Sequence, residues 1–322
     1  MKSRICEILG IDLPIVQGPM SWMTDAHFVA AVSNAGGLGI LGPNAGLHKA
    51  PKTTEALLQT MREEIQKVKA LTDKPFGVPT ILSNDLETVP KVVDLLVEEK
   101  VPVVLINGLD GYDYRPMLEK FKAHHMKTIF RPLTPTVENA RYAQEIGADI
   151  FVATGFDEGG TVPERVIGTF SIVPQMVDAV DIPVMAAGGI ADVRGVRAAF
   201  ALGAEGVFVG SVLLATIENR MHPDVKKMLV ESSAQDLILF RTLPAYYRSL
   251  PTQLAWHLKA LDESGASRES LAQAQTGGYG MRLGMLEGDL EKGYISVGNG
   301  VTYIHAIRSV KETIDDLMQD FI

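Results

Sequence analysis

The stretch IPVMAAGGIADVRGVRAAFALGAEGVFVGS, residues 182–211, contains two short apolar runs on either side of an amphipathic segment. Runs of four or five residues that are apolar throughout and bounded by glycine are typical of parallel strands buried on both faces. The amphipathic segment between them predicts a helix that crosses from one strand to the next. The stretch therefore predicts one strand–helix–strand unit.

The same alternation of short apolar runs and longer amphipathic stretches extends back to the N-terminus. Eight runs predict strands, at Pro14–Gln17, Leu38–Leu41, Phe76–Thr80, Val103–Ile106, Thr128–Arg131, Ile150–Ala153, Pro183–Ala187 and Val207–Gly210. Eight strand-then-helix units predict an α/β fold of the (β/α)8 TIM-barrel class. A doubly wound open sheet is the alternative.

The pattern changes after residue 216. Residues 217–275 contain helical stretches and no convincing strand. We therefore expect a barrel built from residues 1–216 and 276–322, with a small helical domain at 217–275 that serves as a substrate domain or lid. The glycine-bearing segment GDLEKGYISVGNG, residues 288–300, predicts a loop, and Val301–Met318 predicts a final helix that returns to the barrel.

Composition limits the function classes. The chain has 322 residues, 46% of them hydrophobic and 21% charged, which is ordinary for a domain with a buried core. A net charge of −9 disfavours nucleic-acid binding. No apolar run reaches the ~18 residues that a spanning helix needs, and the N-terminus lacks a signal-type apolar segment. The single cysteine and the absence of metal-ligand spacing predict neither disulfide nor metal. A cytoplasmic enzyme acting on a small molecule fits best.

Barrel enzymes carry their sites on the loops that follow the strands. Gly188-Gly189 follows the seventh predicted strand, and Gly210-Ser211 follows the eighth. Glycine lets a backbone approach a ligand closely, and the free N–H groups at a helix start bind phosphate. The two loops therefore predict a phosphate cradle for FMN, a phosphorylated sugar or a nucleotide.

Six segments resemble one known family. They are IDLPIVQGPM, AAVSNAGGLGILG, LTDKPFGV, IGADIFVATGFDEGG, IPVMAAGGIADVRGVRAAFALGAEGVFVGS and GDLEKGYISVGNG. The chain resembles the FMN-dependent nitronate monooxygenases, formerly called 2-nitropropane dioxygenases, and the related flavin-dependent enoyl-acyl-carrier-protein reductases. The resemblance implies that Gly188, Gly189, Gly210 and Ser211 hold the FMN phosphate, that Gly18, Pro19 and Met20 line the isoalloxazine edge, and that Gly298 and Asn299 lie close to the flavin.

Three positions depart from the family pattern. Pro79 stands where the family has an asparagine that bonds the flavin ring, and Thr154 stands where it has an acid. Thr161 stands where a Gly-Gly-His motif presents a histidine to the flavin. Thr161 is no base at neutral pH, although its hydroxyl donates a hydrogen bond. The nitronate assignment therefore needs another polar group in the site.

Arg131 ends the fifth predicted strand and is that candidate. A cation there would stabilise a reduced flavin or bind an anionic substrate, or it would form a salt bridge to Asp157 or Glu158. These two acids are adjacent and so point in different directions; either would serve as a base if partly buried. Tyr246 and Tyr247 would cap the pocket or pack the small domain, and packing is favoured.

The first function hypothesis is an FMN-dependent oxidoreductase that oxidises alkyl nitronates with dioxygen, with Thr161 and Arg131 as its catalytic residues. A substrate supplied as an anion needs no strong base, so the missing histidine is tolerable. One alternative is an NAD(P)H-dependent flavin reductase of an enoyl thioester or a quinone. The others are a flavin-binding barrel without turnover and a barrel enzyme without flavin. The natural substrate, the electron donor and a homodimeric state stay open.

Overall fold

The barrel is closed. The computed structural model describes residues 3–83, 85–109, 111–276 and 278–321, and within them eight parallel strands form one sheet in the order β1-β9-β8-β6-β5-β4-β3-β2. The strands are β1 (Ile15–Gln17), β2 (Gly39–Ile40), β3 (Phe76–Pro79), β4 (Val103–Gly108), β5 (Lys127–Pro132), β6 (Ile150–Thr154), β8 (Val184–Ala187) and β9 (Gly206–Val209). A parallel bridge between Val16 and Leu38 joins β1 to β2. The TIM-barrel prediction is confirmed, and the open sheet is excluded.

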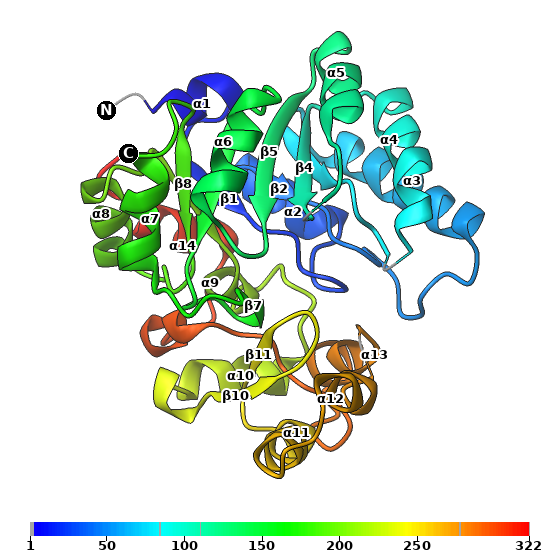
Figure 1. The fold of residues 1–322 in the computed structure, drawn as a ribbon, viewed down its shortest axis with the longest axis vertical. Helices are drawn as coiled ribbons and strands as arrows, with labels where there is room; N and C mark the ends of the chain where they lie inside the picture. The colour runs from blue at the N-terminus through cyan, green and yellow to red at the C-terminus, as the bar shows by residue number, and fades with distance from the viewer. Residues whose placement is uncertain (1–2, 84, 110, 277, 322) are drawn as a thin grey trace.

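A ring of helices surrounds these strands (Figure 1). The helices are α2 (Ala26–Asn34), α3 (Thr54–Leu71), α4 (Val89–Glu98), α5 (Arg115–Ala123), α6 (Val137–Glu145), α7 (Thr169–Val177), α8 (Val193–Ala201), α9 (Ser211–Leu214) and α14 (Val310–Leu317). In α3 the Thr53 side chain accepts a hydrogen bond from the Ala56 N–H, which caps the helix start. Its buried side chains include Leu57, Met61 and Ile65, each four residues apart, so one stripe of the helix faces the sheet.

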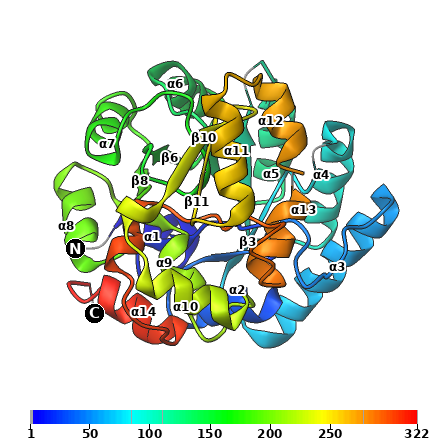
Figure 2. The same cartoon turned by 90° about the horizontal axis from the view of Figure 1, so that it is seen from below.

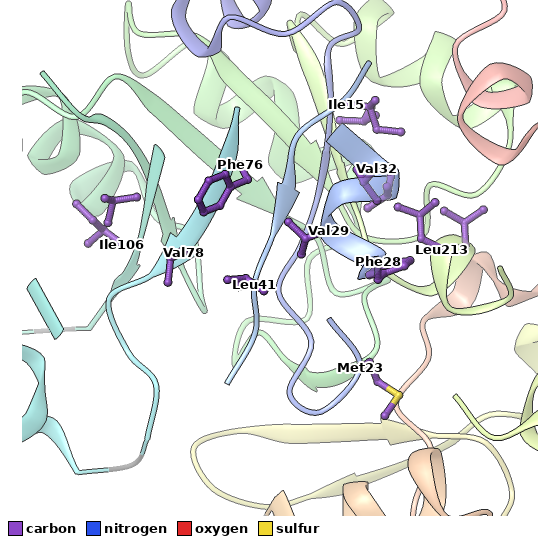
Figure 3. Close-up of a cluster of buried hydrophobic side chains, with 14 of the residues drawn as sticks. Ile15, Met23, Phe28, Val29, Val32, Leu41, Phe76, Val78, Ile106 and Leu213 are labelled. Carbon is purple, nitrogen blue, oxygen red and sulfur yellow. The ribbon is translucent and has the colours of Figure 1, made fainter. Parts of the chain in front are cut away.

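Two apolar layers lie on either side of the strands because neighbouring side chains alternate between faces. Val103 and Leu105 of β4 belong to the cluster inside the barrel, whereas Val104 and Ile106 belong to the cluster under the helices. Figure 3 shows part of the outer layer, where Val29 and Val32 of α2 lie near the strands. Helix α1 (Arg4–Leu9) closes the N-terminal end of the barrel, since Ile5 and Leu9 are part of the inner cluster.

A second part of the chain covers the other end of the barrel. It contains α10 (Pro223–Glu231), β10 (Ile238–Arg241), β11 (Tyr246–Ser249), α11 (Gln253–Glu263), α12 (Arg268–Ala274), α13 (Gly278–Met281) and a π-helical turn at Arg282–Leu286. Seen from below, β10, β11 and α11 lie across the middle of the helix ring (Figure 2). Strand β11 pairs antiparallel with β10 and with β7 (Gly160–Val162), the segment that follows β6.

Two expectations need correction. Residues 217–275 do contain strands, β10 and β11, so the cover is not purely helical. The final helix does not begin at Val301: residues Asn299–Tyr303 form a 3-10 turn, and the Ser309 side chain caps α14, which begins at Val310. The domain limits at 217 and 275 stay a prediction. No helix in the described ranges is both long and apolar enough to cross a membrane.

Candidate active site

One pocket opens at the C-terminal mouth of the barrel, beneath the cover. Ten of the residues that the sequence singled out line it together: Gly18, Pro19, Met20, Arg131, Thr161, Gly188, Gly189, Gly210, Ser211 and Gly298. They come from the loops after β1, β6, β8 and β9, from the end of β5, and from the C-terminal tail. Residues that are far apart in sequence therefore meet where the strands end.

The glycine loop after β8 is shaped by its surroundings. Gly188 and Gly189 have φ angles of +101° and +74°, a backbone region that side-chain-bearing residues rarely adopt. A Cβ at Gly188 would also lie 2.8 Å from the Gly155 carbonyl oxygen. Glycine is therefore required at Gly188 both for its backbone angles and for its close packing against the loop after β6.

The opposite wall has room for a ligand. A Cβ at Gly210 would meet only the Met20 sulfur, at 3.6 Å, which is ordinary contact. The hydroxyl oxygen of the next residue, Ser211, accepts a hydrogen bond from the Gly298 N–H at 2.9 Å. This bond ties the tail to the loop after β9. The loops after β8 and β9 thus face one space from two sides.

A ring of polar groups occupies the top layer inside the barrel. Asn107 follows the inward-facing Leu105, Arg131 follows Ile129, and Thr154 follows Val152, each two residues along its strand. Asn107 and Arg131 are register partners on β4 and β5. Side-chain atoms without a hydrogen-bond partner among the described residues are Thr80 Oγ1, Asn107 Oδ1, Arg131 Nε, Thr154 Oγ1 and Glu158 Oε1.

These orphaned atoms test whether a flavin suits the site. A buried polar atom left unpaired costs ~1–3 kcal/mol. Two of the five, Arg131 Nε and Glu158 Oε1, belong to residues that line the pocket, and Asn107 and Thr154 lie at the ends of the strands on either side of β5, so this part of the mouth has places for a polar ligand. A flavin ring edge offers carbonyl and N–H groups, which match this mixed set of donors and acceptors. The glycine loops of the same mouth suit a phosphate. The residues present therefore fit FMN.

The two adjacent acids after β6 do point in different directions, as expected. Asp157 faces away from the pocket: its carboxylate accepts bonds from the Thr169 N–H at 2.8 Å and from the Asn299 side-chain amide at 3.0 Å. Glu158 lines the pocket. Its Oε2 lies 2.5 Å from Arg131 Nη2, so the expected salt bridge is present, and both residues still face the cavity.

Burial raises the pKa of the Glu158 carboxyl to about 7, because the charged form is poorly solvated there. The positive charges of Arg131 and Arg248 act in the opposite direction. Arg248 of β11 lies behind the loop, where its guanidinium donates to the carbonyl oxygens of Phe156 and Glu158. The pocket therefore holds a carboxyl group that changes its charge near neutral pH.

Three of the singled-out residues lie outside the pocket lining. Pro79 and Thr154 end β3 and β6 and are buried. Asn299 is directed to Asp157 rather than to the pocket, and its neighbours Gly298 and Gly300 line the cavity instead. The resemblance placed Asn299 close to the flavin, which stays a prediction; its amide fastens the tail to the loop after β6.

Tyr246 and Tyr247 pack within the molecule and do not line the pocket, which is the alternative that the sequence favoured. Tyr247 is buried, stacks on Phe240 with ring centroids 5.8 Å apart, and shares a hydrogen bond with the Ser296 hydroxyl. Tyr246 contacts Phe156 edge-on. No described residue of 217–275 lines the pocket; that side is formed by residues the sequence reading missed, among them Met281, Met285 and Ser296. Met281 and Met285 lie in a segment with no pattern that places it over the barrel, whereas Ser296 lies in residues 288–300, whose Gly298 and Asn299 the resemblance placed close to the flavin.

Within the described ranges, no group of three or more His, Cys, Asp or Glu side chains is arranged to hold a metal ion. The chemistry available from the chain itself is therefore that of Arg131, Glu158, the hydroxyls of Thr161 and Ser296, and the backbone of the glycine loops.

Comparison with known proteins agrees with this site. The family model described as nitronate monooxygenase matches residues 2–320. A probable nitronate monooxygenase of Staphylococcus saprophyticus is 31% identical over 74% of this chain and 75% of its own length. A (3aS,4S,5R,7aS)-5-hydroxy-7a-methyl-1-oxo-octahydro-1H-indene-4-carboxyl-CoA dehydrogenase of Rhodococcus jostii is 30% identical over all of this chain and 96% of its own.

Among solved structures, FabK from Thermotoga maritima superposes with a TM-score of 0.86 and 33% identity, covering all of this chain and 96% of that one. The match spans both the barrel and the cover. The chain therefore belongs to the nitronate monooxygenase family and is a flavin-dependent oxidoreductase.

Proposed function

We propose that this protein binds FMN at the barrel mouth and oxidises alkyl nitronates with dioxygen. The observation that carries the proposal is that Arg131, a cation, and Thr161 line the same pocket as the glycine loops. The family resemblance places a histidine at the position of Thr161. A site with a cation and no imidazole suits a substrate that arrives already deprotonated.

The chain's own residues would hold FMN by its two ends. The backbone of Gly188, Gly189, Gly210 and Ser211 would hold the phosphate. The unpaired side-chain atoms of Asn107 and Thr154 would meet the ring, which leaves Arg131 and Glu158 for the substrate. When bound, FMN supplies the capacity to accept electrons from the substrate and pass them to dioxygen. Gly18, Pro19 and Met20 would support the ring edge from the loop after β1.

The substrate would be oriented by Arg131 and Thr161. A nitronate is planar with two oxygens, so it matches a guanidinium as a carboxylate does. The Thr161 hydroxyl would donate to the same anion. Met281 and Met285 line the cavity from the cover and would exclude water while fitting different alkyl chains.

The test is an anaerobic visible spectrum of the FMN-loaded protein. We expect propionate 3-nitronate to bleach the flavin band within seconds and admitted dioxygen to restore it. NADH or NADPH added instead should leave the band unchanged. Rapid bleaching by a nicotinamide and none by the nitronate would overturn the proposal. The matched variant is Arg131→Met, which should lose nitronate bleaching while it keeps bound FMN.

One observation favours a second candidate, the oxidation or reduction of an acyl thioester. One relative that matches this whole chain is named as a carboxyl-CoA dehydrogenase. Glu158, protonated near neutral pH, would donate a hydrogen bond to a thioester carbonyl. Bleaching by NADPH followed by reoxidation with an enoyl-CoA would select this function, with the nicotinamide as the electron donor.

A further inference from the structure

Arg131 and Glu158 form a salt bridge, and each side chain still has one polar atom without a hydrogen-bond partner among the described residues. The pair is made through one guanidinium nitrogen and one carboxylate oxygen, 2.5 Å apart. Arg131 Nε and Glu158 Oε1 are buried and lack hydrogen-bond partners among the described residues. Only 18% and 13% of the two side chains are exposed, and both face the pocket.

An anion that enters this pocket competes with Glu158 for Arg131. When Glu158 is charged, the Arg131–Glu158 pair has no net charge. An anion that approaches the Arg131 guanidinium then meets the Glu158 carboxylate beside it. Two carboxylate-like anions in one poorly solvated site repel each other, so one of them becomes protonated. A protonated Glu158 leaves Arg131 with a free positive charge and itself gains an O–H that can donate.

The other charged groups near Glu158 leave Arg131 as the cation that faces the pocket, although the positive charge of Arg248 also acts to lower the pKa of Glu158. Arg248 approaches from β11, but its guanidinium donates to the backbone oxygens of Phe156 and Glu158. Asp157 on the same loop is directed to Thr169 and Asn299. Tyr247, also on β11, is buried with a pKa held well above its usual value, so it stays neutral. Arg131 is therefore the charge that an entering anion can share.

We propose that Glu158 takes up a proton when an anionic substrate binds to Arg131, so that the pocket binds the substrate anion and one proton together. This inference rests on the proposed function for the identity of the anion. In this step no bond of the substrate breaks: the anion exchanges solvent for the guanidinium, and one solvent proton moves to Glu158 Oε1 or Oε2. Binding then leaves an acid next to the bound substrate, positioned to hydrogen-bond with it.

The raised pKa of Glu158 sets the pH range. Below about pH 7 the acid already carries its proton, so anion binding takes up little. Above about pH 7 each bound anion draws one proton from solvent, and affinity falls about tenfold per pH unit. A pocket that binds the anion on Arg131 alone would show neither effect.

The experiment measures binding of propionate, which resembles a nitronate in shape and charge but is not oxidised here. The FMN-loaded protein is titrated calorimetrically at pH 6 and pH 8 in two buffers with different ionisation enthalpies. We expect uptake of close to one proton per propionate at pH 8 and a small fraction of one at pH 6. Propionate binding without proton uptake at pH 8, or no binding at pH 6, would overturn the inference.

Two variants assign the groups. Glu158→Gln keeps the shape and removes the titration, so propionate should bind about equally at both pH values with no uptake. Arg131→Met should abolish binding at both. If Glu158→Gln still takes up a proton at pH 8, another group carries it and the inference fails.

A second measurement needs no variant. Infrared difference spectra of wild type at pH 8, with and without propionate, should gain the carbonyl stretch of a protonated carboxylic acid; its absence would contradict the inference. Failure of the nitronate function looks different. Propionate would still bind together with a proton, while propionate 3-nitronate would leave the flavin band unchanged.

Discussion

At the scale of single residues, the site depends on two neighbouring acids with opposite surroundings. Asp157 is held by three hydrogen-bond donors, from Thr169 and Asn299, and so fixes the loop. Glu158 lies one residue on, buried in the pocket with one oxygen unpaired. The two residues lie in and beside a turn after β6, where their side chains point apart, and only the fold decides which one reaches the pocket. The sequence alone could not assign these roles.

The raised pKa of Glu158 predicts a pH-dependent stability. Between the unfolded value near 4.5 and the folded value of about 7, the folded chain holds more protons than the unfolded chain. Its contribution to stability is therefore complete below about pH 4.5 and lost as pH rises through 7, by up to ~3 kcal/mol. Urea unfolding of the flavin-free protein from pH 5 to pH 8 should show this loss, and Glu158→Gln should remove it.

The matched control is Glu119→Gln, an exposed glutamate on α5. It should leave the pH slope of the unfolding free energy as in wild type. A Glu158→Gln slope indistinguishable from wild type would mean that the Glu158 carboxyl titrates alike in both states.

Gly210 allows a test of the phosphate loop that spares the fold. Its φ is −129° and a Cβ there has room, so Gly210→Ala should unfold like wild type. Gly210→Asp adds a carboxylate that would face the proposed phosphate. Repulsion between the two negative charges should weaken FMN binding at least tenfold, ~1.4 kcal/mol. Fluorescence titration of FMN measures both variants. Equal affinities for the two would place the phosphate elsewhere.

At the scale of elements, regular βα units were predictable and the short strands were not. Eight apolar runs predicted the barrel strands, because a strand that is covered on both faces must be apolar throughout. Strand β7 has three residues, GTV, of which one is glycine, and a second glycine, Gly159, precedes it; the strand exists because β11 pairs with it. Likewise β10 and β11 flank a turn within residues that read as helical. Their pairing is a long-range property that local pattern does not carry.

The cover has its own core, which predicts a local response to mutation. Leu258 of α11 is 0% exposed and packs with Phe240, Tyr247 and Tyr294. Leu258→Ala should cost ~2–5 kcal/mol by leaving a cavity. Hydrogen exchange should quicken first in β10, β11 and the paired β7, before the barrel strands.

Trp256 lies on the same helix but is 55% exposed, which makes Trp256→Ala the matched control. It should change stability by less than ~0.5 kcal/mol. Uniformly faster exchange across the barrel in Leu258→Ala would mean that cover and barrel unfold as one unit.

At the scale of the whole molecule, closure of the barrel explains which site residues the sequence could supply. A closed parallel barrel brings every strand end to one mouth, so motifs after β1, β5, β6, β8 and β9 had to meet. Barrel closure does not by itself bring residues of the tail and the cover to this mouth. Met281, Met285 and Ser296 reach the pocket only because the cover folds back over the mouth. The Asn299 amide bonds to Asp157, and its place close to the flavin stays a prediction.

The pairing of β7 with β11 has a consequence for recombination between relatives. Gly160 and Thr161 line the pocket and are also the edge strand of the cover's sheet, opposite Arg248 and Tyr247. If residues 217–275 alone were exchanged, β7 of this protein would have to pair with a β11 that comes from another protein. The unit to be exchanged is therefore discontinuous in sequence, because the loop after β6 must be replaced together with the cover. A chimera that exchanges both segments should acquire the substrate preference of the donor.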